Sequence, residues 1–267
     1  MRGSQDHDKD FPWWLVIVAV TGLLLFGRVA LDEDYTRILS MLMRGLGVTV
    51  FVTLISYTGA CLLGLGLALG QLSNSLILRQ VCRLYVEVMR GIPIIVLLLY
   101  VAFVLAPALV SLWDWLLGDV LGVELTGRRG MPYLWRAIIA LTLAYASFLA
   151  EVFRAGLQSV DRGQIEAAEA LGLSRWQRFR HVVFPQAFRT ILPPLGNDFV
   201  AMIKDSSLVS VVGVADITQI GKTWAAGNFR YLETYNVMAL IYLTITIGLS
   251  LLLRRLERRL RSRQERN

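Results

Sequence analysis

Charge, cysteine and histidine are all scarce in this chain. Only 18% of its 267 residues are charged, and there are two cysteines and two histidines. Cys61 lies in an apolar run and Cys82 in a basic segment, so they form neither a CxxC pair nor a disulfide framework. His7 and His181 are far apart in the sequence and have no ligand spacing around them, so we expect no metal site.

A catalytic or nucleotide-binding constellation is also missing. No Ser/His/Asp or Cys/His arrangement is evident, so we do not expect the chain to be an enzyme by itself. Gly221-Lys222-Thr223 looks like the end of a phosphate-binding loop, but such a loop needs a glycine five residues before the Gly-Lys pair. That position is Asp216, so we expect no nucleotide cofactor in this chain.

Apolar side chains are what the chain has in abundance. They make up 55% of the sequence, which is typical of an integral membrane protein. The net charge of +7 would also fit a nucleic-acid-binding protein, but the basic residues lie between apolar runs and at the C-terminus. This distribution indicates the excess of cytoplasmic Lys and Arg that membrane proteins show. We therefore expect the lipid membrane, and no nucleic acid, as a partner.

Six apolar segments are long enough to cross the roughly 30 Å hydrocarbon core of a bilayer as helices. No small-residue cleavage site follows the first segment, so we interpret it as a retained anchor. The fold class that this predicts is an all-α integral membrane protein with about six transmembrane helices. The segments are residues 11–31, 45–70, 91–110, 134–153, 191–214 and 235–253, of which 191–214 is the least hydrophobic.

The connecting segments should alternate between the two sides of the membrane. We expect 32–44, 112–133 and 211–232 to be external, and 71–90 and 154–190 to be cytoplasmic loops. Of the 27 Lys and Arg residues, 18 fall in the segments assigned to the inside, both termini included. This bias predicts that both termini are cytoplasmic.

Small residues at one-turn spacing mark the second apolar segment. They occur as Ala60-x-x-x-Gly64 and Gly66-x-x-x-Gly70. Such spacing lets helix backbones approach closely, so it predicts that this helix packs against another one.

One long polar passage, residues 161–185, interrupts the apolar chain. Its pattern predicts two short helices with a bend between them. Asp161 can cap the first helix while Gln164 reaches back, and Gly172 suits a position of positive φ at its end. Ser174, with a glutamine three residues later, starts a second capped helix. A short, Ala-faced helix between two spans suits docking into the groove of a partner protein.

This passage resembles the EAA loop of ABC importer permeases. In that family the loop is a cytoplasmic coupling helix that sits in a cleft of the ATPase. The resemblance implies that ABC ATPase subunits, which bind the ATP and Mg, dock on the motif residues. Phe184 departs from the leucine that the family usually has. The motif residues are Glu166, Ala167, Ala168 and Gly172, followed by Val182-x-Phe184-Pro185.

Further stretches resemble the subgroup of polar amino acid permeases, the histidine, glutamine, glutamate and arginine importers. The family often has a five-helix core, so residues 11–31 would be an addition to it. The likeness implies a tail, extra helix and external loop over 1–43, a transmembrane domain over 44–258, and a basic cytoplasmic tail over 259–267. The stretches are Arg90–Pro93, Ala144–Gln158, Phe184–Ala187, Leu192–Pro194, Asn197–Phe199 and Lys204–Ser210.

Polar residues within a span are candidates for substrate contact. Burying a charge in a bilayer costs roughly 2.5–3.5 kcal/mol on insertion scales, so such residues usually face a cavity or a partner. Asn197 and Asp198 follow Pro193-Pro194, where we expect the helix to be broken and backbone groups freed. Asp198 could meet the ammonium group of an amino acid, and Asn197 or backbone N–H groups its carboxylate. Lys204 is a further candidate.

Structural roles are the alternative for these residues. Asp198 could instead cap a restarted helix or pair with a neighbouring subunit, and Lys204 could snorkel to the outer surface. Asp198 also stands where glutamate is commoner in the subgroup, which leaves the substrate open.

The sequence thus predicts the permease subunit of a bacterial amino acid ABC importer in the cytoplasmic (inner) membrane. Its expected partners are ABC ATPase subunits inside, an extracytoplasmic amino-acid-binding protein outside, and a second permease subunit, identical or homologous. Two alternatives stay open: an ABC permease for another small polar solute, and an ATP-independent carrier or channel, which would have no use for residues 161–185.

Overall fold

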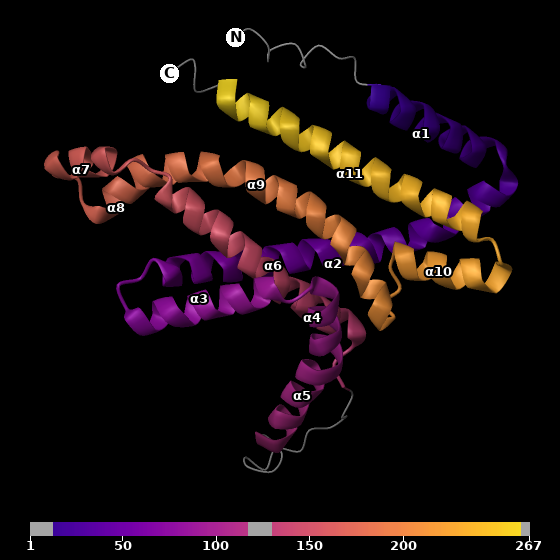
Figure 1. Ribbon diagram of the computed structural model, residues 1–267, viewed down its shortest axis with the longest axis horizontal. Coiled ribbons are helices and arrows are strands. Elements are labelled where there is room, and N and C mark those ends of the chain that lie inside the picture. Colours follow the sequence, from indigo (N-terminus) through magenta and orange to yellow (C-terminus); the bar gives the residue numbers. More distant parts are fainter. Residues whose placement is uncertain (1–12, 117–129, 263–267) are drawn as a thin grey trace, which may run out of the picture.

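The computed structural model describes residues 13–116 and 130–262, which are nearly all helical and contain no strand (Figure 1). Residues 1–12 and 263–267 of the expected tails, and 117–129 of the expected external segment, lie outside this description. In chain order the elements are α1 (Trp13–Leu31), α2 (Glu33–Gln71), α3 (Leu76–Gly91), α4 (Ile94–Tyr100), the π-helical turn η2 (Val101–Leu105), α5 (Ala106–Asp114), α6 (Tyr133–Gln158), α7 (Arg162–Ala170), α8 (Arg175–Arg178), the π-helical turn η4 (Phe179–Val183), α9 (Phe184–Asp205), the 3₁₀ helix η5 (Ser206–Val212), α10 (Ile217–Asn228) and α11 (Tyr231–Ser262).

Four stretches of the described residues are long and apolar enough to cross a membrane. They are Glu33–Gln71, Ile94–Asp114, Tyr133–Gln158 and Tyr231–Leu256. They correspond to four of the six expected spans. α1 contributes only the shorter apolar helix Val20–Leu31, and α9 is absent from this set. The described residues therefore contain four candidate spans by length and hydropathy.

Two expected loops are helical. Residues 33–44, expected in an external loop, form the first turns of α2, because Asp32 caps the helix by accepting a hydrogen bond from the N–H of Asp34 at 2.9 Å. Residues 76–90, expected in a cytoplasmic loop, belong to α3, which runs back along α2 (Figure 1). The domain boundaries expected at 43/44 and 258/259 both fall inside continuous helices, α2 and α11.

The close packing of α2 against α6 organises the bundle. Ala60 and Gly64 are buried, and a Cβ atom at Gly64 would lie 3.0 Å from the carbonyl oxygen of Ala146 in α6. Gly70 faces Cys82 of α3, whereas Gly66 faces open space. The prediction that small residues bring α2 against another helix is therefore confirmed for Ala60, Gly64 and Gly70, but not for Gly66.

α9 continues through the proline pair. It runs unbroken from Phe184 to Asp205 with Pro193 and Pro194 inside it, so the expected break is wrong. Each proline removes one backbone hydrogen bond. Packing of α9 against α6, α2 and α11 holds the helix together across this point. Pro185 lies in the first turn of α9, where a proline costs least.

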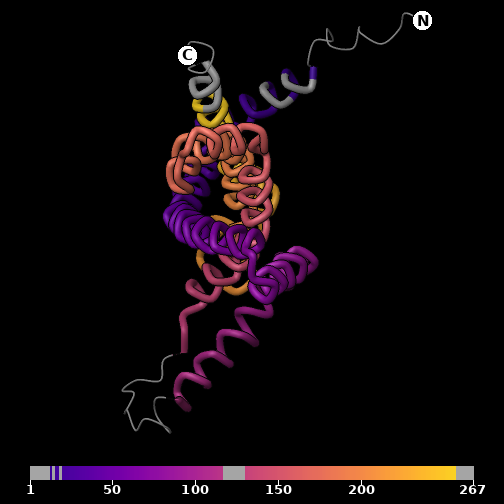
Figure 2. The backbone as a smooth tube through the Cα atoms, turned by 90° about the vertical axis from the view of Figure 1, so that its left-hand side faces the viewer, coloured from indigo at the N-terminus to yellow at the C-terminus, as the bar shows by residue number. Residues whose placement is uncertain are grey.

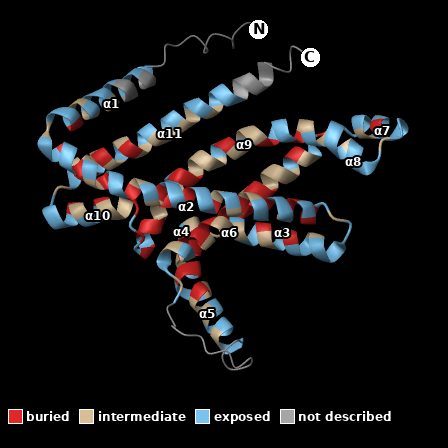
Figure 3. Ribbon diagram, turned by 180° about the vertical axis from the view of Figure 1, so that it is seen from behind, coloured by how far each residue is buried: buried red, intermediate tan, exposed pale blue. Residues whose placement is uncertain are grey.

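The helices are laid out along one long axis. α7 and α8 project at one end of the molecule, and α10 lies towards the other (Figure 1). The described ends of α1 and α11 lie on the same side, while the limb of α4 and α5 extends away from the bundle (Figure 2). Buried residues gather where α6 crosses α2 and α9, and α3, α7 and α8 are mostly exposed (Figure 3).

We predict that Gly64→Leu lowers the stability of the folded chain by about 1–3 kcal/mol, because the added side chain must push α6 away from α2. Gly66→Leu, two residues away and facing open space, is the matched control and should unfold like the unaltered chain. Thermal unfolding in detergent, followed by loss of the monodisperse species, measures both variants. Equal stability of the two would contradict the close helix contact.

Candidate functional site

The first short helix of the polar passage is α7, as predicted. Asp161 caps it, because its Oδ1 accepts a hydrogen bond from the N–H of Gln164 at 3.3 Å. The expected reach of the Gln164 side chain back to Asp161 is not seen. Its Oε1 instead accepts a hydrogen bond from Nε2 of Gln186 at 2.6 Å, which joins α7 to the start of α9.

The bend and the second cap also follow the prediction. Gly172 has a φ of +76°, in the left-handed region that favours glycine. Ser174 and Gln177 then form a complete capping box: the Gln177 N–H donates to Ser174 Oγ at 3.4 Å, and the Ser174 N–H donates to Gln177 Oε1 at 2.9 Å. An ion pair of 2.7 Å between Arg178 and Glu169 links α8 to α7. The two helices are therefore fixed to each other.

Of the four motif residues, three are open to solvent and one is not. Glu166, Ala167 and Gly172 are exposed, whereas Ala168 is buried. Ile165, next to the motif, is part of a small apolar cluster with Val160, Ala187 and Ile191, and its other members include Val152, Leu157 and Val183. The cluster joins α7 to both α6 and α9, while most of the remaining residues of α7 are exposed (Figure 3).

Asp198, the central residue of the second candidate group, is half-buried on α9. It lies close enough to Tyr57 and Cys61 of α2, and to Tyr145 of α6, for its charge to act on them. The hydroxyl of Tyr57 donates to the Leu195 carbonyl at 2.7 Å. Asp198 has no ion pair with any residue that the structure describes.

The other two candidates lie outside this group. The side chains of Asn197 and Lys204 are both exposed. Asp205, beside Lys204, accepts a hydrogen bond from the Tyr145 hydroxyl at 2.7 Å. The structure thus brings Asp198 together with two tyrosines and Cys61. Sequence reasoning missed these partners, although tyrosines inside apolar spans were a signal that could have found them.

The Gly221-Lys222-Thr223 segment is part of α10. Asp216 is fully buried and caps α10, with its Oδ1 accepting from the Gln219 N–H at 2.8 Å. The hydroxyl of Tyr242 in α11 donates to its other oxygen at 3.3 Å. Burial raises the pKa of the Asp216 carboxyl above its usual range, and these hydrogen bonds only partly oppose the rise.

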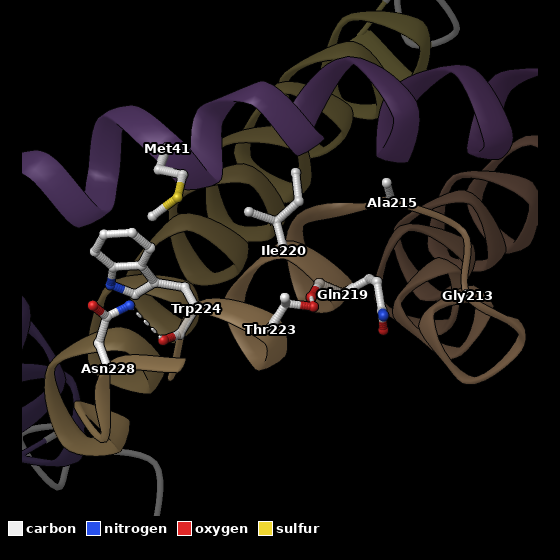
Figure 4. A pocket seen from close by; sticks show the side chains of 8 residues that line it. All are labelled: Met41, Gly213, Ala215, Gln219, Ile220, Thr223, Trp224 and Asn228. Carbon is white, nitrogen blue, oxygen red and sulfur yellow. Dashed lines mark hydrogen bonds between the residues drawn. The ribbon is translucent and has the colours of Figure 1, made fainter. Parts of the chain in front are cut away.

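A pocket of about 440 Å³ lies between α10, the loop before it and α2 (Figure 4). Met41 of α2 closes one side, and Gln219, Ile220, Thr223, Trp224 and Asn228 of α10 form most of the rest. The Asn228 side chain donates to the Trp224 carbonyl at 3.0 Å. The pocket therefore lies towards the opposite end of the molecule from α7 (Figure 1).

Comparison with known proteins gives matches over most of the chain. Residues 60–262 match the family described as "Binding-protein-dependent transport system inner membrane component". The chain is 36% identical over 221 residues to the glutamine transport system permease protein of Escherichia coli (strain K12), covering 83% of this chain and 93% of that protein. It is 35% identical over 211 residues to a probable amino-acid permease protein of Bacillus subtilis (strain 168), covering 79% and 87%.

Solved structures show the same fold. A chain of an amino acid ABC transporter crystallised with histidines matches with a TM-score of 0.70 at 34% identity, covering 85% of this chain and 95% of that one. A chain of the inward-facing MetNI methionine ABC transporter matches with a TM-score of 0.63 at 21% identity, covering 86% and 99%. The second likeness is one of fold alone.

We predict that Asp216→Asn removes a pH dependence of stability. The pKa of Asp216 is higher in the folded chain than in the unfolded chain, where it is about 4. Its contribution to stability is therefore fully present below pH 4 and is lost as the pH rises through the pKa of the folded chain. Asparagine still caps a helix and stays neutral. In thermal unfolding experiments between pH 4 and pH 7, the stability of Asp216→Asn should increase relative to that of the unaltered chain as the pH rises. Asp216→Ala, which also loses the titrating group but in addition loses the cap, should be less stable than Asp216→Asn by about 1 kcal/mol at every pH. Parallel pH profiles for the unaltered chain and Asp216→Asn would contradict this account.

Proposed function

The chain belongs to the family of binding-protein-dependent transport system inner membrane components, and we propose that it is the permease subunit of an ABC importer for polar amino acids. The observation that carries the proposal is the 36% identity, over most of the chain, to a permease named for glutamine transport. The fold supports it through its likeness to a chain of an amino acid ABC transporter, at a TM-score of 0.70 and 34% identity. The chain is a transporter component rather than an enzyme, and it works in the bacterial inner membrane.

The α7–α8 element is the coupling element for the ATPase subunits. Its outer face, with Glu166 and Ala167, is exposed and fits a groove of a partner protein. The ATPase subunits bind the ATP and Mg, whose hydrolysis supplies the energy. Movement of the ATPase subunits is passed to the spans because Gln164 bonds to Gln186 and the Ile165 cluster ties α7 to α6 and α9. Only a rigid connection of this kind can convert a movement of α7 into a movement of the spans.

Asp198 is the substrate contact that the geometry supports best among the candidates. It is a half-buried carboxylate without an ion pair among the described residues, and such a group attracts the ammonium of an amino acid. Two tyrosines, Tyr57 and Tyr145, lie beside it. Because α9 is unbroken, the freed backbone N–H groups expected for the substrate carboxylate are not available. The exposed amide of Asn197 is then the nearest candidate in sequence, and Lys204 is a weaker one.

The orientation follows the charge bias of the sequence, which assigns α7, α8 and both termini to the cytoplasmic side. α10, at the far end, would then face the extracytoplasmic side, where the amino-acid-binding protein delivers the substrate. A second permease subunit, identical or homologous, completes the translocation pathway.

Reconstitution with the ATPase and the binding protein tests the function and the coupling element together. ATPase activity and uptake of a panel of polar amino acids are measured in proteoliposomes. Both should rise when binding protein and one class of amino acid are present. Gly172→Val should lower uptake about tenfold or more, because a β-branched side chain resists a φ of +76°. Gly172→Asn, which tolerates this conformation better, is the matched control and should keep most of the uptake.

Two outcomes of these measurements would contradict different parts of the proposal. Uptake by Gly172→Val at the level of the unaltered chain would contradict the coupling role. Absence of any ATPase subunit from the purified complex would contradict the importer itself.

Asp198→Asn should reduce uptake about tenfold while leaving the amount of bound ATPase unchanged, because it removes a charge from the spans and leaves α7 intact. Asp198→Glu keeps the charge and is the matched control; it should retain most of the uptake. The measurements are initial uptake rates in the same proteoliposomes and the ATPase content of the purified complex. Normal uptake by Asp198→Asn would remove Asp198 from the list of essential contacts.

A further inference from the structure

The pocket beside α10 has a lining that contains no charged side chain. Its apolar surface comes from Met41, Ile220 and Trp224, and polar groups come from the side chains of Gln219 and Asn228, with Thr223 between them along α10 (Figure 4). A free amino acid carries two charges, which would find no partner in this lining. An apolar or aromatic side chain fits better, since the amides can bond to the backbone that carries it.

The volume and the composition agree with a site for a protein partner. About 440 Å³ is enough room for a large side chain. Aromatic residues and methionine are enriched, and charged residues depleted, at the centres of protein interfaces. Arg37 lies over the Trp224 ring, 6.0 Å from its centroid, and fixes one wall from outside the pocket.

Trp224 also holds an unused hydrogen-bond donor. Its indole N–H is buried without a partner among the described residues. In Figure 4 this nitrogen lies on the side of the ring next to the exposed Asn228 side chain. A buried donor without a partner costs free energy. A carbonyl oxygen arriving with an occupant can satisfy it when the Asn228 side chain moves aside.

Phe229 follows the pocket directly at the end of α10 and is held in an unusual conformation. Its φ is +56°, the only positive value of a non-glycine residue in the described chain, and its side chain is 84% exposed. A non-glycine residue in this region costs of order 1–3 kcal/mol. The adjacent Arg230 forms an ion pair with Asp34 at the start of α2, which fixes the turn. The turn therefore holds an exposed aromatic ring one residue after Asn228, which lines the pocket.

We propose that the α10 pocket and Phe229 together form the docking site for the importer's extracytoplasmic binding protein. The pocket receives an apolar or aromatic side chain of that protein, and the Phe229 ring packs against the surface around it. The inference rests on the proposed function, because the family is defined by its dependence on a binding protein. Its place far from α7 supports this partner, since the ATPase and the binding protein must act on opposite sides of the membrane (Figure 1).

The test is the dependence of ATPase activity on the concentration of the purified binding protein of the same importer, in proteoliposomes. Two variants alter the site in opposite ways: Thr223→Trp fills the pocket, and Phe229→Gly removes the ring while relieving the strained φ. Because glycine accepts a φ of +56°, Phe229→Gly should not unfold the chain. Each variant should raise the half-saturating concentration of binding protein about tenfold, with the maximal rate regained at saturation.

Lys222→Trp is the matched control for the pocket-filling variant. Lys222 is exposed on α10 next to Thr223 and does not line the pocket. It should keep the half-saturation of the unaltered chain. Unchanged half-saturation in both Thr223→Trp and Phe229→Gly would overturn the docking site while the importer function stands. A loss of rate in Phe229→Gly that depends on lipid composition and not on binding protein would overturn it in favour of a lipid contact. No stimulation of the unaltered complex at any concentration would overturn the proposed function, and the docking site with it.

Discussion

The approach of α2 to α6 is the contact on which the rest of the structure depends. Lipid is as apolar as the helix surfaces, so helices in a membrane associate through close packing rather than through the hydrophobic effect. At Gly64 the two backbones come so close that a Cβ atom would meet the Ala146 carbonyl. The packing of α2, α6 and α9 brings Tyr57 of α2 and Tyr145 of α6 near Asp198 of α9. The contact of α2 with α6 also holds α6 in place, and α7 follows directly after α6 in the chain.

Both α7 and α10, which lie towards opposite ends of the molecule, are held to the central helices by specific contacts (Figure 1). α7 is held to α6 and α9 by the Ile165 cluster and by the bond between Gln164 and Gln186, so its position is set by the spans. At the other end, α10 is held to both α2 and α11. The Ile217 N–H donates to Thr49 Oγ1 of α2 at 3.4 Å, and the buried Asp216 accepts hydrogen bonds from the Gln219 N–H and from the Tyr242 hydroxyl of α11. Each end is therefore fixed to helices of the bundle, α6 and α9 at one end and α2 and α11 at the other.

Local chemistry made some features of the fold predictable from sequence. The caps at Asp161 and Ser174, and the positive φ at Gly172, depend on residues within a few positions of each other. The neighbours of Asp198 could not be predicted, because Tyr57 lies 141 positions earlier in the chain and only the packing of α2 on α9 brings it near. The continuity of α9 through Pro193 was missed for the same reason, since contacts with three other helices outweigh a local penalty.

The proline pair has a mechanical consequence for α9. Pro193 and Pro194 have no N–H to donate, so the preceding turn of the helix lacks two of the hydrogen bonds that resist bending. The part before the prolines is clamped near α7, and the part after them carries Asp198. The backbone of α9 therefore resists bending least at Pro193 and Pro194, between the part packed near α7 and the part that carries Asp198.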